Sequence, residues 1–326
     1  FSVGGLVGYF RVNGSQTCSL SRNDVAVQIS LPYSNKVSVG GIAGFVDVDG
    51  SSSETGIFGN KVRPHTSINA DNADDLELIY LTAESTEENA VENGQGARAG
   101  GIVGAVQFSQ VEEEPKSFEL KFNSVYGQMV TKSVNSASAI GGIIGYAGTP
   151  ENVYSNSSIG SIVVPGNQDG NLPVGYIVGN LGGSKVNIYS NYHYGEKDAN
   201  VALGVGYCNQ NDIDLIYGNL NNYWHNYRNA IYDAKGKAQL AVSGTVDPFS
   251  LSGTAATLEG IPIYNLVLPV DIMRSRTFSY QLNSNGGSSC KSNLGLEDEF
   301  CWENDTLNNG LPYLTHKRTA YRIVLD

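Results

Sequence analysis

Aromatic and amide side chains gather in one stretch of the sequence, between residues 185 and 232. Flat rings can stack on the apolar face of a sugar while asparagine amides bond its hydroxyl groups, so this composition fits a carbohydrate-binding face. The rings that would form it are Tyr189, Tyr192, Tyr194, Tyr223, Trp224 and Tyr227. A second interpretation stays open, in which the same rings and amides form internal ladders that hold neighbouring strands of a repetitive β-structure together.

Carboxylates near these aromatics raise the alternative of catalysis. Glycoside-cleaving enzymes use two carboxyl groups about 5 to 10 Å apart, a separation that does not follow from sequence. The candidates are Glu196, Asp212, Asp214 and Asp233. No GxSxG, HExxH or GxxxxGK[ST] pattern occurs, so the corresponding hydrolase, zinc-protease and phosphate-binding chemistries have no support. We expect a non-catalytic protein without a cofactor first, and a polysaccharide lyase or hydrolase second.

Metal-binding and disulfide candidates are few. Asp47 and Asp49 resemble the start of a calcium loop, but the later ligand positions are not in a standard arrangement, which favours an Asp-Gly turn. The cysteines are Cys18, Cys208, Cys290 and Cys301. None forms a CxxC pair, so no zinc site is expected. Cys290 and Cys301 share one Ser/Asn/Gly-rich segment and are the best disulfide candidate, whereas the other two are expected to be buried apolar residues.

A recurring glycine motif is the element that must position any site. Each close copy has two glycines, two apolar residues and a third glycine. The glycines expected to be structural are Gly4, Gly5, Gly8, Gly40, Gly41, Gly44, Gly100, Gly101, Gly104, Gly141, Gly142 and Gly145. Two weaker copies end at Gly179 and Gly206, and successive last glycines lie 36, 60, 41, 34 and 27 residues apart. Such irregular spacing suits a solenoid whose loops vary while its rungs stay constant.

The motif predicts a short buried strand beside a tight corner. Its β-branched residues favour a strand, and glycine at the same places in every copy indicates a corner that each coil turns at one point. Stacked coils would align Leu6, Ile42, Ile102 and Ile143 in one internal ladder, with rungs about 4.8 Å apart. The predicted class is all-β, a parallel β-helix with irregular loops.

With these glycine copies and a second polar pattern at 122–127, 152–160 and 185–192, the chain resembles the GLUG-motif repeats of bacterial cell-surface and secreted proteins. The resemblance covers roughly residues 1 to 207. It implies a right-handed β-solenoid with adhesive, scaffolding or substrate-presenting duties, and it brings no known catalytic residues.

The domain boundaries follow from where the repeats change. Residues 1–236 are predicted to form the β-helix, and the widest spacing locates an insertion at 60–98 whose acidic residues favour a solvated loop over a cation-capturing one. Residues 237–316 are predicted to form a C-terminal cap, because an uncovered last rung exposes apolar core and free strand edges. Residues 317–326 would link to a following module.

The cap is expected to contain the one helical segment, at 273–283. Its apolar residues near one face are Met273, Phe278 and Leu282. The order of residues in 300–314, with its Asn-Gly-Leu-Pro-Tyr-Leu finish, looks like the C-terminal close of GLUG-type solenoids. Residues 321–326 resemble the first strand of the Listeria-Bacteroides repeat, which would make the chain part of a longer protein.

Composition bounds the partners and the location. A net charge of -12 over 326 residues disfavours nucleic acids and polyanionic polysaccharides. No run of 18 apolar residues exists, so no membrane span is expected. Abundant Gly, Tyr, Ser and Asn indicate an extracellular or cell-surface protein, in which sequons at Asn13, Asn156 and Asn304 matter only in a eukaryotic secretory host. The chain starts at Phe1 inside a motif copy, so any signal peptide would lie upstream.

The expected partners are a glycan or another cell-surface ligand and the other domains of the same longer chain. A third alternative is self-association, in which an uncapped coil stacks on a second copy and builds a filament.

Overall fold

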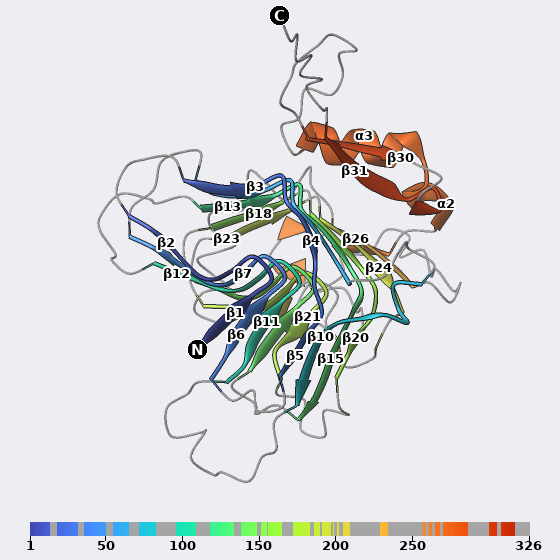
Figure 1. The fold of residues 1–326 in the computed structure, drawn as a ribbon. Helices are drawn as coiled ribbons and strands as arrows, with labels where there is room; N and C mark the ends of the chain where they lie inside the picture. Colours follow the sequence, from blue (N-terminus) through green and yellow to red (C-terminus); the bar gives the residue numbers. More distant parts are fainter. Residues whose placement is uncertain are drawn as a thin grey trace, which may run out of the picture.

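The structure is a computed structural model, and every statement below concerns the residues that it describes. These are residues 1–13, 18–31, 36–49, 55–64, 72–82, 96–108, 118–133, 138–148, 151–154, 156–164, 172–182, 186–189, 191–196, 198, 201, 205–208, 229–233, 257–258, 261–262, 265–267, 270–285, 300–304 and 308–316. Strands dominate them, and they lie mostly in parallel sheets (Figure 1). The predicted all-β class is confirmed.

The described strands form five parallel sheets, named A to E. Sheet A contains β1 (Ser2–Gly4), β6 (Ser38–Gly40), β11 (Arg98–Gly100), β16 (Ala139–Gly141) and β21 (Val174–Gly175). Sheet B contains β2 (Val7–Val12), β7 (Ala43–Val48), β12 (Val103–Phe108), β17 (Ile144–Ala147), β22 (Val178–Leu181) and β25 (Val205–Cys208). Sheet C contains β3 (Ser19–Ser21), β8 (Gly56–Phe58), β13 (Phe118–Lys121), β18 (Glu151–Tyr154) and β23 (Val186–Tyr189).

The other two parallel sheets are less even in length. Sheet D contains β4 (Asp24–Ala26), β9 (Lys61–Arg63), β14 (Ser124–Tyr126), β19 (Ser157–Ile159), β24 (Tyr192–Gly195), β26 (Asn229–Asp233) and β29 (Asn265–Val267). Sheet E contains β5 (Ile29–Leu31), β10 (Glu77–Thr82), β15 (Gln128–Ser133) and β20 (Ile162–Val163). Two antiparallel pairs complete the described strands: β27 (Thr257–Leu258) with β28 (Ile261–Pro262), and β30 (Phe300–Asn304) with β31 (Pro312–His316).

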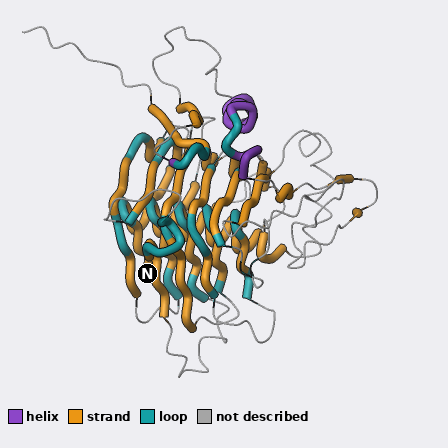
Figure 2. Tube along the Cα trace, turned by 90° about the vertical axis from the view of Figure 1, so that its right-hand side faces the viewer, coloured by secondary structure: helices purple, strands orange, loops and turns teal. Residues whose placement is uncertain are grey.

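Successive strands visit the sheets in the fixed order A, B, C, D, E, and each such passage is called a circuit here. Circuits 1 to 4 comprise β1–β5, β6–β10, β11–β15 and β16–β20, and circuit 5 comprises β21–β24. Figure 1 looks along the row of circuits, and Figure 2 shows the circuits side by side. Each strand therefore pairs with its counterpart one circuit away, which is why loops can vary in length without disturbing the sheets.

The glycine motif makes the corner between sheets A and B. The residues opposite one another in sheet A are Gly4, Gly40, Gly100, Gly141 and Gly175. The chain then bends, and Ile42, Ile102 and Ile143 follow as fully buried side chains. The amide of Ile42 donates to the carbonyl of Ile102 at 2.9 Å, and the amide of Ile102 donates to that of Ile143 at 2.9 Å. Leu6 holds the same place in circuit 1 but is 44% exposed at the edge.

The third glycine of each motif permits direct contact between two backbones. A Cβ on Gly145 would lie 2.6 Å from the amide nitrogen of Ala99 and 2.6 Å from the carbonyl oxygen of Gly104. Gly44 and Gly104 meet the backbones of Val3 and Val39 in the same way. Sheets A and B thus touch at this corner with no side chain between them.

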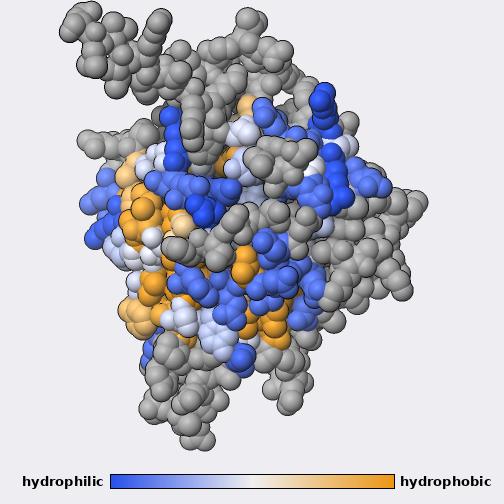
Figure 3. Space-filling model, turned by 45° about the vertical axis from the view of Figure 1, so that its right-hand side comes forward, coloured by the Kyte–Doolittle hydropathy of each residue, from blue (hydrophilic) through white to orange (hydrophobic). Residues whose placement is uncertain are grey.

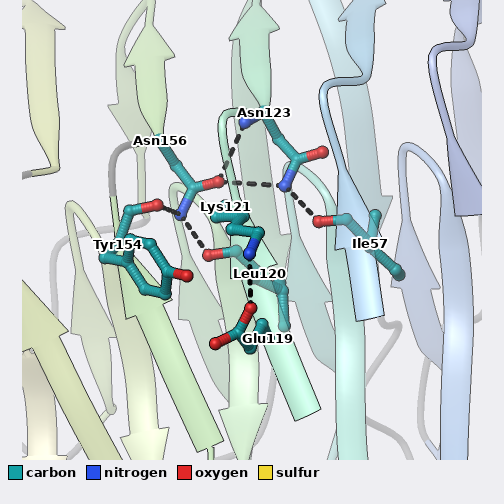
Figure 4. Close-up of polar contacts among 7 residues, drawn as sticks. All are labelled: Ile57, Glu119, Leu120, Lys121, Asn123, Tyr154 and Asn156. Atoms are coloured by element: carbon teal, nitrogen blue, oxygen red, sulfur yellow. Dashed lines mark hydrogen bonds and ion pairs between the residues drawn. The ribbon is translucent and has the colours of Figure 1, made fainter. Parts of the chain in front are cut away.

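An asparagine ladder crosses the corner between sheets C and D. Its members are Asn23, Asn60, Asn123, Asn156 and Asn191. The Nδ2 of Asn123 donates to the Oδ1 of Asn156 at 2.9 Å and to the carbonyl of Ile57 at 2.8 Å (Figure 4). The amide of Asn123 donates to the same Oδ1 at 3.0 Å. Each side chain therefore satisfies backbone and side-chain groups in the interior, and the sequon at Asn156 is fully buried.

The apolar core lies inside the circuits, where the inward side chains of each strand meet those of the neighbouring sheets. Buried members of this core include Val39, Ile57, Val62, Leu120 and Ile188. On the side of the molecule shown in Figure 3, hydrophobic side chains form separate patches with hydrophilic ones between them. No helix of the described part of the chain is long and apolar enough to cross a membrane.

Part of the predicted insertion at 60–98 belongs to the sheets. β9 lies in sheet D, and β10 pairs with both β5 and β15 in sheet E. Leu78, Ile79 and Leu81 are buried in the core. The apolar residues 78–81 within the insertion therefore form a strand of sheet E and are not part of a loop. Most of the acidic residues around this strand lie outside the described residues, so the solvated loop predicted for them stays a prediction.

The C-terminal segment differs from the predicted cap in where it packs. Its helices α2 (Val270–Met273) and α3 (Arg276–Asn285) and the pair β30–β31 lie on the outer side of sheet D (Figure 1). The predicted helical face is confirmed, because Met273, Phe278 and Leu282 are buried there. The described segment thus covers a flank of the circuits, and β29 adds another parallel strand to sheet D beyond the predicted boundary at residue 236.

Tyr192 and Lys61 hold this segment in place. The hydroxyl of Tyr192 donates to the carbonyl of Pro312 at 2.6 Å, and its ring meets those of Phe278 and Trp302 edge-on at 5.8 and 5.7 Å. The Nζ of Lys61 donates to the hydroxyl of Tyr313 at 3.1 Å. Residues about 120 positions apart in sequence are therefore locked together through one buried ring.

We expect Gly145→Ala to lower the free energy of unfolding by about 2 to 3 kcal/mol, because the added methyl group meets backbone atoms that cannot rotate away. Gly8→Ala is the comparison variant and should cost less, since its added Cβ would closely meet one backbone atom, the carbonyl oxygen of Ser2 at 2.7 Å, on the edge strand β1. Urea unfolding of both variants checks the prediction. Equal losses in the two would contradict the backbone-contact argument.

We expect Asn123→Ala to lower the free energy of unfolding by about 3 kcal/mol, because the buried donors of Asn60 and the carbonyl of Ile57 lose their partner. Asn23→Ala, at the partly buried first rung, should lower it by about 1 kcal/mol. Thermal or chemical unfolding distinguishes them. A loss at Asn123 no larger than at Asn23 would show that the ladder is not a continuous stabilising element.

Candidate functional site

Two of the predicted sugar-binding rings are interior residues. Tyr192 is fully buried and Tyr194 is 6% exposed, both in the cluster under α3 and β30. A ring whose faces are covered by protein cannot stack on a sugar, so these two residues are withdrawn from the site. Tyr189 ends β23 in sheet C, and its side chain is not described. Tyr223, Trp224 and Tyr227 lie outside the described residues.

A row of partly exposed rings lies instead on the outer face of sheet B. The Cα register aligns one row across the circuits: Tyr9, Phe45, Ala105, Tyr146 and Asn180. Tyr9 is 55% exposed, and its ring stacks on that of Phe45 with the planes 2° apart and the centroids 5.7 Å apart. Alternation along β7 buries Val46 in the core and turns Phe45 outward.

Charged groups flank this stack. The Nη2 of Arg11 donates to the Oδ2 of Asp49 at 2.8 Å, and its Nε lies 3.8 Å from the Oδ2 of Asp47. The hydroxyl of Tyr9 donates to the Oδ2 of Asp47 at 2.6 Å, and this bond raises the pKa of Tyr9. The hydrogen bond to Asp49 raises the pKa of Arg11. The two carboxylates considered for calcium are therefore engaged by Arg11, and the described residues contain no cluster of three or more potential metal ligands.

A second cation lies further along the row. Arg98, at the start of β11, places its guanidinium carbon over the ring of Tyr146, 3.9 Å from the centroid. Burial lowers the pKa of Arg98. The name "sheet B face" is used below for Tyr9, Arg11, Phe45, Asp47, Asp49, Arg98 and Tyr146. This face combines flat rings with fixed donors and acceptors on a rigid sheet, which is suited to non-covalent recognition of a polar ligand.

None of these seven residues was predicted as a sugar-binding residue from the sequence, although the signal was present. An aromatic residue follows the last glycine of the motif in Tyr9, Phe45 and Tyr146. Because the motif as a whole is apolar, it predicts a buried strand, and that prediction does not single out the aromatic residue as exposed. The period of two along a strand places it on the opposite side from the core valines.

The carboxylates considered for catalysis are only partly described. The backbone amide of Glu196 donates to the Oδ1 of Asp74 at 3.3 Å. Burial raises the pKa of Asp74, and the charge of Glu196 adds to that shift. The observed contact thus joins Asp74 to the backbone of Glu196, and a raised carboxyl pKa is one feature that acid–base pairs share. Asp233 lies in β26 with its side chain undescribed, and Asp212 and Asp214 are outside the described residues.

The structure shows the oxidation state of two of the four cysteines. Cys301 is disulfide-bonded, whereas Cys18 is a free, partly buried thiol. The partner of Cys301 is therefore Cys208 or Cys290, whose side chains are not described. The predicted pair Cys290–Cys301 stays a prediction.

Circuit 5 carries a ring pair inside the core that the sequence did not predict. Tyr176 occupies the place of the second motif glycine, and its ring stacks on that of His193 with the centroids 4.0 Å apart. In circuit 4 the same two places hold Gly142 and Ser158. Within the described part of the chain, neither buried ring nitrogen of His193 has a partner at hydrogen-bonding geometry, although the backbone of Ser158 lies near enough to affect the ring. Burial lowers the pKa of His193 to about 3, so the ring is neutral at physiological pH.

We expect this buried histidine to make the protein acid-sensitive. Its pKa is about 3 when folded and about 6.5 when unfolded, so between these pH values the unfolded chain binds a proton that the folded chain does not. The free energy of unfolding should fall by up to about 1.4 kcal/mol per pH unit as the pH drops through this window, with no contribution above it. His193→Phe keeps a ring against Tyr176 and should flatten this slope. Identical slopes in urea unfolding of both proteins would refute the assignment.

Comparison with known proteins gives no match of any kind. No family model matches the chain, no curated protein matches its sequence, and no solved structure matches its fold. The function is therefore inferred from the residues of this chain alone.

Proposed function

We propose that the chain is a non-catalytic module of an extracellular or cell-surface protein, which binds carbohydrate through the sheet B face. In this proposal the circuits are those of a right-handed parallel β-helix, and the repeats are of the GLUG type that the glycine motif resembles. The cyclic order of the sheets and the in-register glycines support the first part. The assignment to GLUG-type repeats is supported only by the glycine motif and the polar pattern in the sequence.

The observation that carries the binding function is the exposed stack of Tyr9 on Phe45 beside the Arg11 ion pairs. Elsewhere in the described chain most large rings serve the interior, as Tyr126, Tyr176 and Tyr192 do. In this pair the ring of Tyr9 is more than half exposed and that of Phe45 is partly buried, so part of the stack is open to a ligand. It offers ring surface for a sugar together with charge-assisted donors and acceptors for its hydroxyl groups.

The geometry also favours an extended ligand. Parallel strands are spaced about 4.8 Å apart, so a chain that runs along the row of circuits passes Tyr9, Phe45 and Tyr146 in turn. The fully buried Ala105 lies between the last two. The row continues past Tyr146 to Asn180 in circuit 5. A linear polysaccharide that crosses the strands fits this arrangement better than a small compact molecule.

The second candidate is a polysaccharide-active enzyme, and the raised pKa of Asp74 beside Glu196 favours it. The same two residues also have a structural function, since Asp74 accepts the backbone amide of Glu196 and so ties residues 72–76 to the end of β24. Release of new sugar ends from a bound polysaccharide would distinguish the enzyme from the binding module.

We expect Tyr9→Ala and Phe45→Ala to weaken binding to a glycan array or to insoluble plant polysaccharides by about tenfold, because one stacked ring contributes about 1 to 2 kcal/mol. Tyr80→Ala is the matched control, since this partly buried ring lies on sheet E with Lys132 5.4 Å from its centroid. A wild-type chain that binds no glycan, or variants on the two sheets that behave alike, would contradict the proposal.

A further inference from the structure

Arg98 occupies an unusual position on the sheet B face. It belongs to circuit 3, and its guanidinium lies against the ring of Tyr146 in circuit 4. A guanidinium stacked on a ring uses its flat surface, while its N–H donors lie in its plane and stay available for a planar acceptor. Arg98 is partly buried, so these donors are partly withdrawn from water.

No carboxylate within the described part of the chain pairs with this cation. The two acidic residues of the same face, Asp47 and Asp49, are engaged by Arg11 instead. The lowered pKa of Arg98 has burial as its main cause, and no anion among the described residues offsets that burial. A partly buried charge without a partner is unfavourable for the free protein. An anionic group supplied by a ligand would remove that penalty.

Ala105 lies in register between Phe45 and Tyr146, so the two rings are two circuits apart in the row. Ala105 itself is fully buried, and Arg98 flanks this position from sheet A. A ligand that lies along the row would therefore contact the rings and the guanidinium of Arg98, and not the strand at Ala105.

We propose that Arg98 binds the carboxylate of an acidic sugar, so that the sheet B face recognises a glycan with uronic-acid units among neutral sugars. The inference rests on the proposed carbohydrate-binding function and adds the class of glycan. Bidentate pairing with a carboxylate is the contact for which a planar guanidinium is best suited.

The net charge of -12 limits how acidic this glycan can be. It repels a dense polyanion, but at physiological ionic strength the repulsion between exposed charges is screened beyond about 8 Å. The contact at Arg98 is direct and is not screened in this way. A mainly neutral polymer with isolated uronates satisfies both conditions, whereas a polyuronate does not.

The test compares two matched ligands, a xylo-oligosaccharide that carries one glucuronate and its carboxyl-reduced counterpart. The wild-type chain should bind the acidic form about tenfold more tightly in calorimetric titration, and Arg98→Gln should remove this preference, with a larger loss for the acidic form than for the reduced form. Arg98→Lys should keep part of it, because the charge remains while the planar fork is lost. Equal wild-type affinity for both forms would overturn the inference, and so would an equal loss for both forms in Arg98→Gln.

A second set of measurements separates this inference from the proposed function. Tyr9→Ala should weaken both ligands equally. If the wild-type chain binds the reduced form and gains nothing from the carboxylate, the inference fails while carbohydrate binding stands; if it binds neither form, the inference fails as well. Equal affinity for an acidic peptide with one carboxylate would overturn the assignment to a sugar.

The NMR signal of the Arg98 Nε–H group can be followed in the wild-type chain, so this measurement does not depend on the folding of a variant. It should shift on addition of the acidic oligosaccharide and stay unchanged with the reduced one. An unchanged resonance at saturating acidic ligand would overturn the contact.

Discussion

Direct contact between the backbones of sheets A and B is the constraint on which the rest of the structure depends. At the third glycine of each motif, a strand of one sheet lies against the backbone of the other, and even a methyl group is too large for the space. This contact closes the corner in every circuit and fixes the direction in which each strand of sheet B leaves it. The outward row of rings and charges on sheet B follows from that direction, because the alternation along each strand begins at the corner.

The interior shows how a repetitive fold accommodates change in single circuits. In circuits 1 to 4 the interior space between the A–B corner and sheet D is narrow. There the second glycine of the motif faces a valine or Ser158 on sheet D. In circuit 5 both partners have changed together, and Tyr176 with His193 fills the same space as a stacked pair. The replacement keeps the volume filled but places two unpartnered imidazole nitrogens in the core. The ring pair thus fills the interior of circuit 5, but among the described residues the nitrogens of His193 gain no hydrogen bonds there.

The repeats made the fold largely predictable from the sequence, whereas the residues of the sheet B face could not be predicted in this way. Glycines at recurring positions indicate a shared corner from sequence alone, so the all-β class and the alignment of Ile42 with Ile102 and Ile143 followed. Exposure of a ring depends instead on what packs over it from elsewhere in the chain. Tyr192 is covered by a segment about 120 residues away, at Pro312, and no local pattern indicates that contact. Tyr9 stays open for the same non-local reason, since nothing in the described chain packs over it.

The asparagine ladder gives the row of circuits a polarity. Each side-chain amide donates toward the next circuit and accepts from the previous one, from Asn23 through to Asn191. The amide dipoles therefore point the same way and reinforce one another, as peptide dipoles do along a helix. Partial negative charge faces outward at the Asn23 end and partial positive charge at the other end. Any further circuit or second copy would meet a chemically different surface at each end, so only one orientation of stacking continues the column.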